Sequence, residues 1–85
     1  MDIMELGTRI ENKLKDNNLV GKKISCGYSY PSGERNVQFE YNKNHLNKDA
    51  ITAIVESYAK LNHAKSGVRF FDSYFSFFVS CNTEI

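Results

Sequence analysis

The stretch GVRFFDSYFSFFVSC, residues 67–81, decides how this 85-residue chain folds, because it holds five of the six Phe residues. The dipeptide at 72–73 (Asp-Ser) is the only turn-like pair within it. A two-residue hairpin at this point would set Phe71 opposite Tyr74. A single long strand with a bulge at the same point is the alternative.

Either arrangement divides these side chains between two faces, because successive residues of a strand point to opposite sides of the sheet. In the hairpin, Phe70 opposes Phe75 and Val68 opposes Phe77. One face is then apolar throughout and carries Val68, Phe70, Phe75, Phe77, Val79 and Cys81. The other face mixes aromatic rings with polar groups and carries Arg69, Phe71, Tyr74, Ser76, Phe78 and Ser80.

An earlier hairpin is indicated by residues 22–30 and 36–41, which both alternate between apolar and polar side chains. The turn sequence YPSGER joins them. A loop with an even number of residues keeps the apolar groups of both strands on one face, whereas a one-residue slip would mix the faces. We therefore expect the cross-strand pairs Tyr28–Val37, Cys26–Phe39 and Ile24–Tyr41.

Residues 2–16 and 48–65 have the apolar periodicity of amphipathic helices. The first should end at the Asn pair 17–18. The second should begin after the N-cap Asn47 and stop before Gly67. The expected buried stripes are Ile3, Leu6, Ile10 and Leu14, with Glu11 on the polar side, and then Ile51, Ile54, Val55, Tyr58 and Leu61.

The order helix, strand, strand, helix, strand, strand predicts a single α+β domain over residues 1–85. Two amphipathic helices can cover one face of one sheet. We therefore expect a two-layer sandwich, with an antiparallel sheet of three to four strands and both helices on one face. The rings of Phe71, Tyr74 and Phe78 would lie on the face that no helix covers.

Three aromatic side chains left in water would expose an apolar patch of several hundred Å², which is unusual unless the patch has a use. We therefore predict a binding site formed by Arg69, Phe71, Tyr74 and Phe78. The rings would bury apolar area in a contact, and Arg69 would pair with an acid or stack at its edge. Two alternatives remain: a second copy meets this face in a structural homodimer, or the chain covers it with Leu19, Val20 or residues 83–85.

The formal net charge of +1 gives no global field to attract a polyanion, which disfavours a dedicated double-stranded DNA binder. Sheet-displayed aromatic rings near Lys23, Lys43 and Arg69 would nevertheless suit the stacking of single-stranded bases. A single-stranded nucleic-acid-binding protein is therefore the alternative class, although Glu40 and Asp72 dilute the positive charge.

No set of residues predicts catalysis, a metal site or a cofactor. His45 precedes the second helix and His63 lies near its end, and neither has a Ser or Cys partner at a recognisable spacing. Cys26 and Cys81 fall on the expected core face, where thiols behave as small apolar groups. The Cys and His residues also lack the close paired spacing that is typical of zinc sites.

The apolar runs are too short to span a bilayer, and the N-terminus lacks the apolar region of a signal peptide. We therefore expect a cytoplasmic protein that contacts no membrane. The frequent Asn and Lys residues are typical of AT-rich genomes such as those of phages and mobile elements. The sequence predicts a small, non-catalytic accessory or inhibitor protein of such an origin, which binds another protein or itself.

Overall fold

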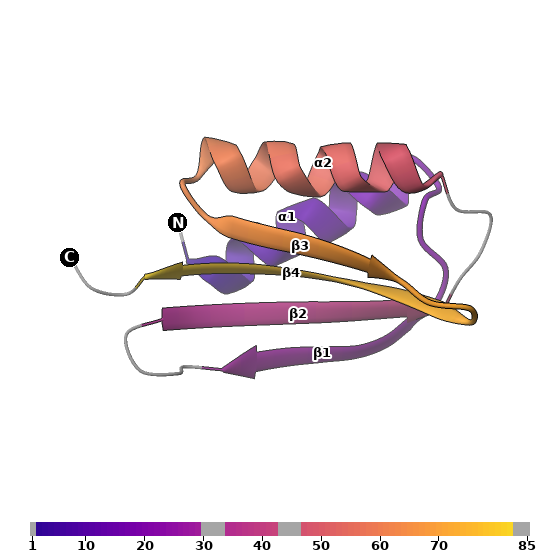
Figure 1. Ribbon diagram of the computed structural model, residues 1–85, viewed down its shortest axis with the longest axis horizontal. Coiled ribbons are helices and arrows are strands. Elements are labelled where there is room, and N and C mark those ends of the chain that lie inside the picture. Colours follow the sequence, from indigo (N-terminus) through magenta and orange to yellow (C-terminus); the bar gives the residue numbers. More distant parts are fainter. Residues whose placement is uncertain (1, 30–33, 43–46, 83–85) are drawn as a thin grey trace.

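The computed structural model describes residues 2–29, 34–42 and 47–82 (Figure 1). Its elements are α1 (Ile3–Asp16), β1 (Lys23–Ser29), β2 (Glu34–Asn42), α2 (Lys48–Leu61), β3 (Lys65–Phe70) and β4 (Tyr74–Asn82). The order of helices and strands predicted from the sequence is confirmed.

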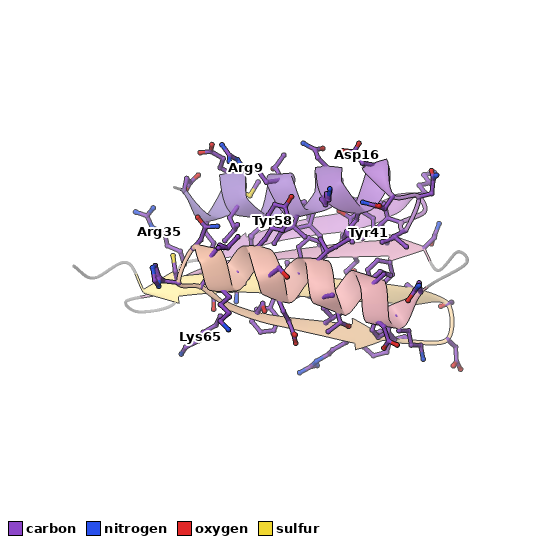
Figure 2. All side chains as sticks on the ribbon, turned by 90° about the horizontal axis from the view of Figure 1, so that it is seen from above. Arg9, Asp16, Arg35, Tyr41, Tyr58 and Lys65 are labelled. Carbon is purple, nitrogen blue, oxygen red and sulfur yellow. The ribbon has the colours of Figure 1, made fainter. Side chains whose placement is uncertain are left out.

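The four described strands form one antiparallel sheet with the order β1-β2-β4-β3. Helix α1 packs over β2 and β4, and α2 packs over β3, so both helices lie on the same face of the sheet (Figure 1). Figure 2 shows the two helices side by side, with Tyr58 between them. The opposite face carries no helix from the described part of the chain. The predicted two-layer α+β sandwich is thereby confirmed.

The last two strands form the hairpin that the dipeptide at 72–73 predicts. Phe70 lies opposite Phe75, as expected. The backbone N–H of Phe71 donates to the carbonyl of Tyr74 at 2.8 Å and closes the turn. The alternative of one long bulged strand is therefore wrong.

The first hairpin has two of its three predicted pairs, Tyr28–Val37 and Cys26–Phe39. The third predicted pair is wrong, because Lys23 lies opposite Tyr41 in place of Ile24. The register shifts between Lys23 and Ser25, which leaves Ile24 as an extra residue in β1. A bulge of this kind changes the side to which the preceding side chain points.

The core lies between the helices and the sheet. The predicted stripe of α1 is buried, and the aromatic rings of Phe39 and Phe77 stack beneath it with their centroids 5.2 Å apart. The sheet contributes the buried side chains of Val37, Phe39, Tyr41, Phe75, Phe77 and Val79. Helix α2 contributes Ile51, Val55 and Ala59.

The C-terminal end of α2 differs from the sequence prediction. The helix ends at Leu61, because Asn62 donates its side-chain amide to the carbonyl of Tyr58 and His63 adopts a left-handed φ of 56°. Helix α1 ends in the same way, with Asn18 at a φ of 56°. Gly67 therefore does not stop the helix and belongs to β3.

Leu61 was expected in the buried stripe of α2 but is 79% exposed. The buried positions of the helix follow Ile51, Val55 and Ala59 at intervals of four. Leu61 comes two residues after Ala59, which rotates it about 200° away from that stripe. The spacing of the smaller Ala59 thus defines the buried face, and the larger Leu61 lies in water.

The edge strand β1 also differs from the prediction, which placed Ile24 and Cys26 in the core. Ile24 is 50% exposed and Cys26 is exposed as well. Strand β1 is the edge strand next to β2, whereas the helices pack mainly over β2, β4 and β3. Cys81, on the central strand β4, is half-buried and packs against the core as expected.

A polar cluster connects α1 to the first hairpin, with Glu11 and Tyr41 buried and Lys23 at its exposed edge. Glu11, expected on the polar side of α1, is buried and accepts a hydrogen bond of 2.6 Å from the hydroxyl of Tyr41. The Nζ atom of Lys23 lies 3.2 Å from the same carboxylate oxygen and 5.3 Å from the centre of the Phe39 ring. The bulge at Ile24 thus brings Lys23 to the helix-covered face, where it compensates the buried charge of Glu11.

The Tyr41 hydroxyl has a strongly perturbed ionisation. Burial raises its pKa far above the ordinary value, and the hydrogen bond to Glu11 and the electrostatic interactions with Glu11 and Cys26 raise the pKa further. The folded protein therefore keeps this proton under alkaline conditions in which the unfolded chain, with a pKa near 10, releases it. Stability from the neutral hydroxyl is fully present below about pH 10 and is lost as the pH rises above that value.

Above pH 10, we predict that the free energy of unfolding decreases with pH more steeply in the wild-type protein than in Tyr41→Phe. The difference between the two slopes should be about 1.4 kcal/mol per pH unit. All other ionisable groups are common to the two proteins, so the difference between the two curves isolates Tyr41. Urea denaturation at pH 9, 10, 10.5 and 11 measures it. Parallel curves would show that Tyr41 is not held neutral by the fold.

Candidate binding site on the open sheet face

The sheet face opposite the helices, called the open face below, contains a hollow of about 360 Å³. Strand β2 lines it with Asn36, Gln38 and Glu40. The β3–β4 hairpin lines the remainder and contributes the four side chains predicted from the sequence, Arg69, Phe71, Tyr74 and Phe78. The fold therefore gathers these four residues around one concave surface.

Phe71 and Tyr74 form one aromatic pair at the turn of the β3–β4 hairpin. Their ring centroids are 4.5 Å apart and their planes differ by 15°, so the rings are stacked. Phe71 remains 40% exposed, and Tyr74 is half-buried. Because the rings cover one face of each other, their outer surfaces remain open to a partner.

Phe78 occupies the other part of the hollow and lies over Gly67. The two residues are paired across β3 and β4. A Cβ atom at Gly67 would overlap Cε1 of the Phe78 ring, so the ring rests directly on the glycine backbone. This contact leaves Phe78 half-buried. The contact with Gly67 therefore covers part of the Phe78 ring, which the sequence analysis placed on the face that no helix covers.

We predict that Gly67→Ala destabilises the protein by about 1 kcal/mol, because the added methyl group displaces the Phe78 ring into water. The loss should disappear when Gly67→Ala is introduced into a Phe78→Ala background, where no ring is displaced. Urea denaturation of the four proteins of this double-mutant cycle gives the coupling energy. Equal effects of Gly67→Ala in both backgrounds would contradict the ring-on-glycine contact.

The two charged groups of the hollow lie in one cross-strand row. Ser76 of β4 pairs with Glu40 on one side and with Arg69 on the other. Two strand spacings, or roughly 10 Å, separate the backbones of Glu40 and Arg69. The Ser25 hydroxyl donates to Glu40 at 2.8 Å. Arg69 is exposed and has no ion pair or hydrogen bond to another side chain among residues 2–29, 34–42 and 47–82.

The hollow offers recognition groups: three aromatic rings, side-chain amides, a guanidinium and a carboxylate. Its described lining includes neither an imidazole nor a thiol. His63 is exposed at the end of α2, and His45 lies outside the described residues. No group of three or more His, Cys, Asp or Glu residues within the described ranges is arranged to hold a metal ion.

Leu19 and Val20, which the sequence analysis considered as covers for the aromatic rings of the open face, lie elsewhere. Leu19 and Val20 pack against the core cluster between the helices and the sheet. Residues 83–85 lie outside the described residues.

Neither α1 nor α2 has the length and apolar character required to cross a membrane, and the same holds for every helix in the described ranges.

Sequence reasoning missed the contribution of β2 to this site. Alternation places Asn36, Gln38 and Glu40 on the side away from the core, but it does not reveal which strand lies next to β2. In the structure Gln38 lies opposite Phe78, and Glu40 lies opposite Ser76. The adjacency of β2 and β4, which are distant in the sequence, creates the hollow.

Comparisons with protein-family models, with curated proteins and with solved structures give no match to this chain. Its function is therefore inferred from the residues of the open face.

Proposed function

We propose that this chain is a small, non-catalytic accessory or inhibitor protein that binds another polypeptide through the open face. The observation that carries the proposal is the hollow on the sheet face that neither α1 nor α2 covers, lined by Arg69 and three aromatic rings. Aromatic side chains and Arg supply much of the energy in protein–protein contacts, because they bury large rigid surfaces and form several directed interactions. A cytoplasmic location and an origin in a phage or mobile element belong to the same proposal and derive from composition.

The charge of the site favours a polypeptide over a nucleic acid. Binding to a nucleic-acid backbone requires a track of cationic groups. The described lining of the hollow contains one cation, Arg69, and one anion, Glu40, and the net charge of the chain is only +1. The aromatic rings alone would also suit stacked bases, so a single-stranded nucleic acid is the alternative that the experiment must separate.

Site-specific photocrosslinking tests this proposal. A benzophenone derivative of phenylalanine replaces Phe71, and the protein is irradiated in an extract of the cells that produce it. The control carries the same probe in place of Thr8, an exposed residue of α1 on the helix-covered side. We expect an adduct with a polypeptide from position 71 and none from position 8. The adduct should decrease when Arg69→Ala is added, because Arg69 contributes to the contact.

Treatment with nuclease separates the two classes of partner. An adduct whose gel mobility is unchanged by nuclease, and which mass spectrometry resolves into a crosslinked peptide, supports the proposal. An adduct that nuclease shortens would replace it with nucleic-acid binding. Equal crosslinking from positions 71 and 8 would show that the open face has no special role.

A further inference from the structure

We infer that the polypeptide on the open face is a second copy of this chain, related to the first by a two-fold axis that runs along β4. This inference rests on the proposed function, because it names the partner of the same site. It follows from the arrangement of charges on the open face, which is complementary to itself under one particular rotation.

Among residues 2–29, 34–42 and 47–82, no opposite charge pairs with either of the two charged side chains of the hollow. Arg69 has no ion pair with another described residue, and Glu40 is bonded to a neutral hydroxyl, that of Ser25. Both lie in the row centred on Ser76, one on each side of β4. The open face thus carries a cation one strand away from β4 on one side and an anion one strand away on the other side.

When two copies meet face to face, a two-fold axis along β4 exchanges the two sides of that strand and preserves position along it. Arg69 of one copy then lies over Glu40 of the other, and the reverse pair forms as well, as an isologous interface requires. The two sheets pack with their strands nearly aligned, which is the common geometry for stacked sheets.

The same rotation also brings compatible side chains together at the other positions along β4. Tyr74 and Phe78 lie on the axis and meet their own counterparts, so aromatic surface is buried at the centre. On β3 the open-face residue next along from Gly67 is Lys65, which pairs through Ser80 with Asn36 of β2. Lys65 of one copy therefore lies over an amide of the other, and no like charges meet in the described rows of Ser76, Phe78 and Ser80.

The alternative in-plane axis, perpendicular to the strands, is disfavoured by the same charges. An axis through the Ser76 row in that direction preserves the side of β4 and would place Arg69 over Arg69 and Glu40 over Glu40. Juxtaposed like charges in a contact are strongly unfavourable. Of these two axes, the charge pattern favours the one along β4.

Sedimentation equilibrium of the purified chain, from about 1 µM to about 1 mM, tests the inference over the range in which weak and moderate complexes dissociate. The wild-type protein should pass from monomer to dimer. Arg69→Glu and Glu40→Arg should each raise the dissociation constant at least about tenfold, because each creates two like-charge contacts. An equimolar mixture of these two variants should form a heterodimer as readily as the wild type dimerises.

The mixture is diagnostic because the heterodimer contains two attractive pairs, whereas each variant alone contains two repulsive pairs. Circular dichroism and urea midpoints confirm that both variants are folded. The double variant Arg69→Glu/Glu40→Arg should also dimerise, and it replaces the mixture if one single variant is unstable. Dimers that persist in Arg69→Glu, or a mixture that stays monomeric, would overturn the inference.

Failure of this inference is distinguishable from failure of the proposed function. A wild-type chain that stays monomeric to 1 mM, while the probe at position 71 crosslinks to a different polypeptide, overturns only the dimer. A monomeric chain without any crosslink specific to position 71 overturns both. A dimer that is restored by the charge-reversed mixture supports both.

Discussion

Replacing Glu11 by Ala should lower the free energy of unfolding by about 3 kcal/mol, the largest effect that we expect from a single polar side chain. The substitution leaves the Tyr41 hydroxyl buried without its acceptor and Lys23 without its counterion. An unsatisfied buried donor costs about 1–3 kcal/mol, and loss of the ion pair with Lys23, whose side chain is 41% exposed, adds less than about 1 kcal/mol. Urea denaturation at pH 7 measures the change.

Glu5 provides a matched control on the same helix. It forms an ion pair with Arg9 at 3.2 Å, but both side chains are more than half exposed. Glu5→Ala should therefore cost no more than about 0.5 kcal/mol. Glu11→Gln keeps an acceptor for Tyr41 and should lie between the two. If Glu11→Ala were no more harmful than Glu5→Ala, the polar cluster would not stabilise the fold.

The second large effect should separate the two faces of the β3–β4 hairpin. Phe75 is fully buried, and its ring lies against those of Tyr41 and Phe70. Phe75→Ser removes this ring and leaves a hydroxyl in the core, so it should cost about 4 kcal/mol or more, a large share of the stability of a domain of this size. Phe71→Ser, on the open face, should cost less than about 1 kcal/mol.

Urea denaturation at low protein concentration compares the two variants as monomers. The pair Phe75→Leu and Phe71→Leu gives a milder comparison if Phe75→Ser is already unfolded in water. Equal losses from the two positions would mean that Phe71 belongs to the core of the monomer. The open face would then be a structural surface and no site for a partner.

Much of the fold could be predicted because local signals agree with the tertiary structure. The dipeptide at 72–73 fixes the register of the last hairpin, and with it the side of the sheet to which each ring of residues 67–81 points. In the first hairpin Tyr28 lies opposite Val37, as the alternation of the two strands predicts, and the predicted turn at residues 30–33 lies outside the described residues. The stripe of α1 is strongly periodic, and Asn47 caps α2 through a 3.0 Å hydrogen bond to the N–H of Ala50.

The errors arise where a long-range contact overrides the local pattern. Glu11 occupies a position that a polar side chain can tolerate only because Tyr41 and Lys23 meet its carboxylate. Lys23 reaches it through a bulge at Ile24, and neither β1 nor its alternation signals that bulge. Cys26 is exposed, because alternation gives the face of a residue but not its distance from the helices.

The candidate site could be predicted in composition but not in shape. The sequence places Arg69, Phe71, Tyr74 and Phe78 on one side of the hairpin. It does not show that Phe78 lies over Gly67, nor that Glu40 shares a row with Arg69. Both features depend on the packing of side chains across strands, and the second depends on the sheet order.

We propose that the open face contacts another polypeptide. The most direct test is crosslinking from a benzophenone probe at position 71, compared with the same probe at position 8. We predict a nuclease-resistant adduct with a polypeptide, whether a second copy or another chain, from position 71 alone. Absence of that adduct, or its equal formation from position 8, would contradict the claim.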